Sequence, residues 1–174
     1  MSSNGLMTMA SATAEDYARD PTRWGSAEVA SHFPGFEHMD VRTRGAVIRL
    51  RHGGSGPPLL LVHGNPQNHT CWYKIAARLA KHYHVILPDL RGYGDSSLPE
   101  PGANHVNYSF RSMAQDLLEI MDQLGYERFY VAGHDRGRAR RTACAWTTRS
   151  ASSRCASWTS CRITTCGRTS RRAG

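Results

Sequence analysis

The pentapeptide Gly-His-Asp-Arg-Gly at residues 133–137 directly follows the apolar run Phe129 to Ala132 and has Asp135 at its centre. A sharp turn from a strand into a helix holds its central residue in strained geometry, and small flanking residues give the chain room to pass. Such nucleophile elbows usually carry serine, which attacks carbonyl carbon. A carboxylate is better suited to displacing a leaving group from saturated carbon, which leaves an alkyl ester for water to cleave later. The motif therefore predicts hydrolysis at an sp3 carbon with Asp135 as nucleophile.

Apolar runs of strand length alternate with helical patterns upstream of this turn. Leu59 to Val62 is apolar on both faces, as in a central strand of a parallel sheet. The alternation predicts an α/β fold, a mostly parallel sheet with flanking helices whose reactive residues follow the carboxyl ends of strands. The other expected strands are 37–44, 46–51, 84–87 and 129–132, and the expected helices are 68–82 and 109–124.

Charge is distributed unevenly along the chain. The net charge is +8, but residues 138–174 contain nine Arg and no acidic residue, so residues 1–137 are nearly neutral. Overall charge therefore gives little support to a nucleic-acid partner for the main part of the chain. Arg is nevertheless interleaved with Trp in the last segment, which leaves nucleic-acid binding through this tail as a distant alternative.

Four of the five cysteines lie in the same segment, without the close pairs of a zinc site. The chain starts without the apolar region of a secretory signal, and it has no apolar run of about 18 residues that could cross a membrane. We therefore expect a soluble cytoplasmic protein without disulfides, metal or cofactor, acting on a small molecule. Oligomeric state is left open.

Composition divides the chain into three parts. Residues 1–31 are small, polar and unpatterned, as in a loose leader, and residues 32–137 hold the α/β pattern. Residues 138–174 are rich in Arg, Ser, Thr and Cys, with few large apolar side chains. So little apolar surface cannot offset the entropy lost on folding. We expect this tail to be largely disordered and the strand 129–132 to lie at the edge of the sheet.

The same composition is typical of GC-rich coding sequence read out of frame. Read one base earlier, residues 138–144 are compatible with the peptide A-R-T-A-H-R-M, and residues 157–162 with L-D-I-V-P. The segment therefore predicts a frameshift near codon 137. A genuine basic extension is the alternative.

Two further motifs follow predicted strands. His63-Gly64-Asn65-Pro66 comes directly after Val62, and Asp-Leu-Arg-Gly-Tyr-Gly-Asp-Ser-Ser occupies residues 89–97. Together with the elbow, they resemble the haloacetate (fluoroacetate) dehalogenase branch of the α/β-hydrolase fold, which is close to the epoxide hydrolases. The resemblance covers about Phe36 to Gly137.

This resemblance implies roles for individual residues. Asp135 would be the nucleophile, and Arg136 would hold the substrate carboxylate while offsetting its repulsion from Asp135. The backbone N–H groups of Asn65 and Arg136 would form an oxyanion hole. His63 is expected to hold its loop, and Asp89 to cap another. The residues expected to support these motifs are His63, Gly64, Pro66, Gly133, His134 and Gly137.

The resemblance also implies residues that this chain does not supply. In the family the catalytic histidine, its acid partner and the halide-binding residues follow the elbow, whereas residues 138–174 contain no histidine or carboxylate. We therefore expect an enzyme by family, and a chain that does not complete turnover. An epoxide hydrolase would share Asp135 and the upstream motifs and is the main alternative. Arg136 favours the haloacid, because an epoxide carries no charge to hold.

Overall fold

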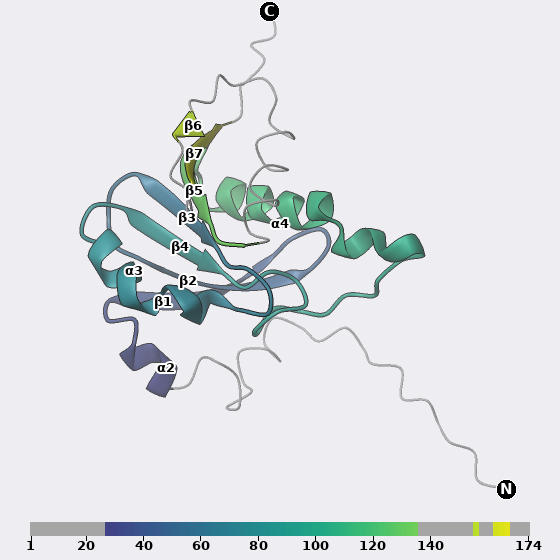
Figure 1. Ribbon diagram of the computed structural model, residues 1–174, viewed down its shortest axis with the longest axis horizontal. Helices are drawn as coiled ribbons and strands as arrows, with labels where there is room; N and C mark the ends of the chain where they lie inside the picture. The colour runs from purple at the N-terminus through teal and green to yellow at the C-terminus, as the bar shows by residue number, and fades with distance from the viewer. Residues whose placement is uncertain (1–26, 136–154, 157–161, 168–174) are drawn as a thin grey trace, which may run out of the picture.

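The computed structural model describes residues 27–135, 155–156 and 162–167, which form one layered unit (Figure 1). Its strands make a single sheet of order β1-β2-β4-β3-β5-β7-β6. The strands are β1 (Phe36–Arg42), β2 (Val47–Gly53), β3 (Pro58–Val62), β4 (His84–Pro88), β5 (Arg128–Gly133), β6 (Cys155–Ala156) and β7 (Arg162–Gly167). The helices are α2 (Ala27–Ser31), η1 (His69–Trp72), α3 (Tyr73–Leu79), η2 (Ala103–Tyr108) and α4 (Phe110–Gln123).

The parallel part of the sheet consists of β4, β3 and β5. β3 pairs in parallel with β4 on one side and with β5 on the other, whereas β1, β2, β6 and β7 join through antiparallel pairings. The central strand is buried from Leu59 to Val62, as its apolar run predicts. The predicted α/β arrangement is confirmed. Its consequence for a site is that the loops after β3, β4 and β5 leave the same edge of the sheet.

Each face of the sheet packs against its own helical layer (Figure 1). Leu60 and Val62 point into a core with α4, while Leu59 and Leu61 point into a second core on the side of α3. This alternation follows from the twofold side-chain period of a strand. Trp72, the last residue of η1, is buried in the second core.

Helix α4 begins and ends close to the predicted bounds. The Ser109 side chain accepts a hydrogen bond from the backbone N–H of Ser112, which caps the helix. Gly125, just past the end, has a φ of 79°, a conformation that glycine adopts without steric cost. The apolar stripe of α4 is buried at Met113, Leu117, Ile120 and Met121.

The partner of β5 differs from the prediction. We expected 129–132 to lie at the edge of the sheet, but β7 pairs with β5 antiparallel from Arg128↔Gly167 to Gly133↔Arg162. The segment Arg-Ile-Thr-Thr-Cys-Gly contains β-branched residues that suit a strand, and backbone pairing needs no large apolar side chains. Within the segment expected to be disordered, the structure thus describes β6 and β7. At the other end, α2 lies in the last residues of the expected leader.

Among the described residues, no helix is both long and apolar enough to cross a membrane.

Candidate functional site

Asp135 follows β5 at the carboxyl edge of the sheet, one residue beyond His134. Its φ is 50°, in the left-handed region that side-chain-bearing residues rarely adopt. The strained turn that the sequence predicts is therefore present at Asp135. Arg136 and Gly137, predicted as carboxylate clamp and flanking glycine, lie outside the described residues.

Pairing of β3 with β5 brings the loop of residues 63–66 against this turn. Val62 and Gly133, the last residues of the two strands, are direct partners and both are buried. The His134 N–H then donates to the Val62 carbonyl at 3.1 Å. The predicted motif residues of the two loops are therefore adjacent in space, although about 70 positions separate them.

Gly64 allows the closest approach between the two loops. A Cβ at this position would lie 2.6 Å from the Cβ of Asp135 and 2.9 Å from its Oδ2. Any side chain at residue 64 would displace the carboxylate. This steric limit is a physical reason for the glycine in the His-Gly-Asn-Pro motif.

Asn65 provides the most informative polar contact of the site. Its backbone N–H donates to Oδ2 of Asp135 at 3.0 Å, and both residues are exposed to solvent. Pro66 follows through a cis peptide bond. One of the two N–H groups predicted for the oxyanion hole is thus directed at the predicted nucleophile.

His63 has both ring nitrogens engaged inside the protein. It is fully buried; Nε2 accepts the Leu90 N–H at 3.0 Å, so Nδ1 carries the proton and donates to the Gly64 carbonyl at 2.8 Å. These bonds support the expected role of His63 in holding the loop. His134 instead is exposed, and its Nδ1 lies 3.2 Å from Oε1 of Gln67.

The loop after β4 is anchored by Asp89, which has no exposed surface. Its carboxylate accepts the backbone N–H of His69 at 2.6 Å and that of Asp95 at 3.1 Å, and it also pairs with Nδ1 of His69 at 2.9 Å. Burial alone would raise the pKa of Asp89, but the contacts with His69 and Asp95 outweigh it and hold the pKa below its ordinary value. Asp89 therefore organises this loop as an ionised anchor.

Tyr93, in that loop, is a site residue that sequence reasoning missed. Its hydroxyl donates to Oδ1 of Asn65 at 2.8 Å, and its ring packs edge-on against His63 with centroids 5.3 Å apart. Its place in the loop after β4 would have indicated it only together with the strand order, in which β4 lies beside β3. The sequence does not show that order.

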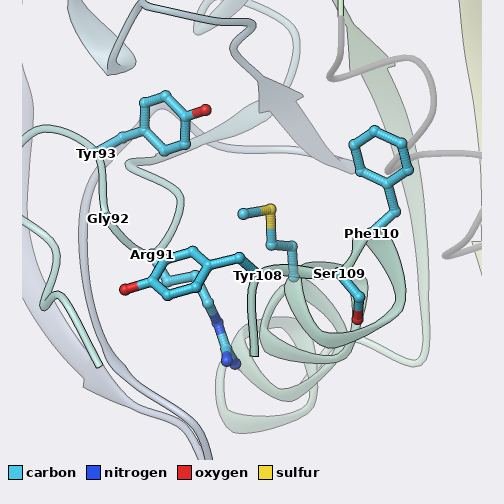
Figure 2. A pocket seen from close by; sticks show the side chains of 7 residues that line it. Arg91, Gly92, Tyr93, Tyr108, Ser109 and Phe110 are labelled. Atoms are coloured by element: carbon cyan, nitrogen blue, oxygen red, sulfur yellow. The ribbon is translucent and has the colours of Figure 1, made fainter. Parts of the chain in front are cut away.

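A pocket of about 600 Å³ lies on the α4 side of Tyr93 (Figure 2). Figure 2 shows the rings of Tyr93 and Phe110 at opposite ends of it, with Arg91 and Tyr108 along a third side. The Arg91 guanidinium pairs with both oxygens of Asp116, at 2.6 and 2.7 Å, so its charge is compensated. The pocket walls are therefore largely aromatic and apolar. Its lining residues are Arg91, Gly92, Tyr93, Tyr108, Ser109, Phe110 and Met113.

Within the described part of the chain, no group of three or more His, Cys, Asp or Glu residues could hold a metal ion. Cys71 is half-buried, and burial raises the pKa of its thiol to about 12, which disfavours the reactive thiolate. Asp135 is therefore the better candidate for a nucleophile.

Known hydrolases match this chain over part of its length. The fluoroacetate dehalogenase of a Burkholderia species is 52% identical over 105 residues, which cover 60% of this chain and 34% of that protein. The soluble epoxide hydrolase of Corynebacterium sp. strain C12 is 41% identical over 100 residues, covering 58% and 33%. The resemblance that the motifs indicated is confirmed. The chain spans about a third of the length of these curated relatives.

A solved structure from Nostoc sp PCC 7120, described only as a hydrolase of the alpha/beta type, superposes with a TM-score of 0.65 at 52% identity. The superposition covers 66% of this chain and 40% of that one. The family model for the alpha/beta hydrolase fold matches residues 57–161, a range that continues past Gly137, where the motif resemblance ends. The chain belongs to the α/β-hydrolase fold family.

Proposed function

We propose that the site belongs to a hydrolase that removes halide from a 2-haloacid such as haloacetate, through an ester on Asp135. The observation that carries the proposal is the hydrogen bond from the Asn65 N–H to Oδ2 of Asp135. A carboxylate in a strained turn, with a backbone donor on one oxygen, is equipped to attack with the other and later to be regenerated.

In the first step, Oδ1 of Asp135 attacks the halogen-bearing carbon from the side opposite the halogen. The new carbon–oxygen bond forms as the carbon–halogen bond breaks, and halide leaves with the bonding electrons. Oδ2 stays on the Asn65 N–H, so the ester carbonyl forms inside the oxyanion hole.

In the second step, water attacks Cγ of the ester and negative charge develops on Oδ2. The Asn65 N–H, and in this proposal the Arg136 N–H, would stabilise that charge by a factor on the order of 10² to 10³ for each donor. Collapse breaks the Cγ–Oδ1 bond: the departing alkoxide takes one proton of the attacking water and leaves as the hydroxy acid, the other proton goes to a general base, and the carboxylate is restored. Neither step requires a cofactor.

Arg136 is proposed to select the acid. A negatively charged substrate approaching Asp135 meets repulsion between two carboxylates, and an adjacent guanidinium offsets it while fixing orientation through paired hydrogen bonds. An epoxide has no such group. The similarity to epoxide hydrolases keeps that reaction as the second candidate, and the effect of Arg136 on charged and neutral substrates separates the two.

For the 174-residue chain itself, we propose that the reaction stops at the ester. Residues 138–174 contain no histidine or carboxylate to activate water, and a positioned base typically contributes 10²- to 10⁴-fold. If a frameshift accounts for this composition, restoring the frame near codon 137 will open a long reading frame that contains a histidine in a late loop. A stop within a few codons in that frame would rule out the frameshift.

The experiment that tests the nucleophile relies on the expected accumulation of the ester on Asp135. Mixed with fluoroacetate, the chain should release one fluoride and gain one carboxymethyl group, measured with a fluoride electrode and by intact mass. Hydroxylamine should remove the group, because it cleaves esters and leaves thioethers on cysteine intact. A chain that shows no hydroxylamine-labile adduct on Asp135 after prolonged incubation would overturn the proposal.

A further inference from the structure

Tyr93 connects the loop after β4 to the predicted oxyanion hole. Its hydroxyl donates to Oδ1 of Asn65 at 2.8 Å, and the N–H of the same Asn65 donates to Oδ2 of Asp135 at 3.0 Å. Asn65 is thus held through its side chain on one side and through its backbone on the other.

Tyr93 is itself held in place by contacts with Leu90 and His63. Its N–H donates to the Leu90 carbonyl at 2.9 Å, and its ring packs against His63, which itself accepts the Leu90 N–H. The start of this loop is fixed by the buried Asp89. Asn65, by contrast, lies in an exposed loop, so a fixed partner for its side chain limits how far its peptide can turn.

We infer that Tyr93 is a positioning residue: it holds the side-chain amide of Asn65 so that the Asn65 N–H stays aimed at Oδ2 of Asp135. The inference rests on the proposed function for its catalytic consequence. Its structural part, the dependence of the Asn65 N–H on the Tyr93 hydroxyl, stands on the two hydrogen bonds alone.

The consequence belongs to the step that breaks the ester down. Attack at Cγ places negative charge on Oδ2, and a donor helps only while it points at that oxygen. Loss of support should forfeit part of the donor's contribution, about tenfold out of the 10² to 10³ attributed to a whole donor.

The first test measures hydrogen exchange of the Asn65 amide by NMR in the 174-residue chain. Tyr93→Phe removes the hydroxyl and keeps the ring against His63, and it should speed exchange of this amide about tenfold. Tyr126→Phe is the matched control, since it deletes a hydroxyl that lies 2.5 Å from Nδ1 of His84, outside the site. Unchanged exchange in Tyr93→Phe would overturn the inference.

The second test follows cleavage of the Asp135 ester by hydroxylamine. The hydroxylamine nitrogen attacks Cγ, the carbonyl electrons move onto Oδ2, and collapse breaks the Cγ–Oδ1 bond. Glycolate leaves with a proton from the nitrogen, and a hydroxamate remains on Asp135. In the folded chain the oxyanion hole speeds this reaction, and no protein base takes part in it. The rate of cleavage in the 174-residue chain therefore measures the contribution of the oxyanion hole.

We expect Tyr93→Phe and Asn65→Ala each to slow this cleavage about tenfold, and the double variant to be no slower than either. Tyr126→Phe should match the parent, and all ester forms should react alike once unfolded in urea. Additive losses, or no loss, would contradict the inference. If the parent forms no ester, the proposed function fails, and amide exchange still decides the role of Tyr93.

Discussion

Asp89 and Asp135 occupy equivalent places in the fold and have opposite environments. Each follows a strand of the parallel part of the sheet and accepts a backbone N–H from another loop. Asp89 has no exposed surface and accepts the N–H groups of both His69 and Asp95, whereas Asp135 is exposed and sits at a φ of 50°.

The difference shows how one sheet edge can use the same side chain for two purposes. Burial and several donors fix Asp89 as a charged anchor that is not accessible to a small molecule. Exposure and backbone strain hold Asp135 where a substrate can reach it. We expect substitutions at Asp89 to change stability and substitutions at Asp135 to change chemistry.

The largest expected effect is that of Asp135→Asn, which should abolish ester formation because a neutral amide cannot displace halide. The free energy of unfolding should change by less than about 0.5 kcal/mol, since the residue is exposed and Asn tolerates the left-handed region. Intact mass after incubation with fluoroacetate and urea denaturation measure the two properties. Adduct formation at the parental rate would show that Asp135 is not the nucleophile.

Arg136→Leu should slow ester formation with bromoacetate by about 3 kcal/mol, or roughly 10²-fold, because it removes a charge-assisted pair from the substrate. With the neutral bromoacetamide the loss should be much smaller. The hydroxylamine-labile adduct is measured in both cases, which separates the ester from cysteine alkylation. Equal losses on both substrates would remove Arg136 from the site and favour an epoxide hydrolase.

The features of the fold and of the site that depend on local sequence pattern could be predicted from the sequence. Leu59 to Val62 reads as a buried strand from its apolar run, and the elbow is visible as glycines around Asp135. The contact between Tyr93 and Asn65 was not predicted, since it depends on β4 lying beside β3. Pairing of β7 with β5 was missed because the prediction counted apolar side chains, whereas a strand is also held by its backbone.

Asp89→Ala should lower the free energy of unfolding by about 3 kcal/mol at neutral pH, because it leaves buried donors of His69 and Asp95 without their acceptor. The pH dependence has a defined sign. The folded pKa lies below the unfolded value of about 3.9, so the carboxylate stabilises the fold above that pH and loses this effect as pH falls through the folded pKa.

Urea denaturation between pH 7 and pH 3 measures both effects. The difference in stability between parent and Asp89→Ala should shrink toward the acid end of that range. A difference that stays constant with pH would mean that Asp89 acts through its shape and its loop, and not through its charge.

The smallest and most selective effects are expected from two glycines, each of which lies against one of the aspartates. A Cβ at Gly64 would lie 2.6 Å from the Cβ of Asp135, and a Cβ at Gly94 would overlap Oδ2 of Asp89. Gly94 also has a φ of 52°, where a side chain adds strain of about 1–3 kcal/mol.

Gly64→Ala should therefore slow ester formation roughly tenfold by shifting the carboxylate of Asp135, while the free energy of unfolding falls by only about 1 kcal/mol. Gly94→Ala should do the reverse, lowering the free energy of unfolding by about 2 kcal/mol through the crowded anchor. Its folded fraction should still form the ester at nearly the parental rate. Fluoride release measures the rate of ester formation in both variants, and urea denaturation measures their free energy of unfolding. If the two variants lose the same property to the same extent, the assignment of stability to Asp89 and of chemistry to Asp135 is wrong.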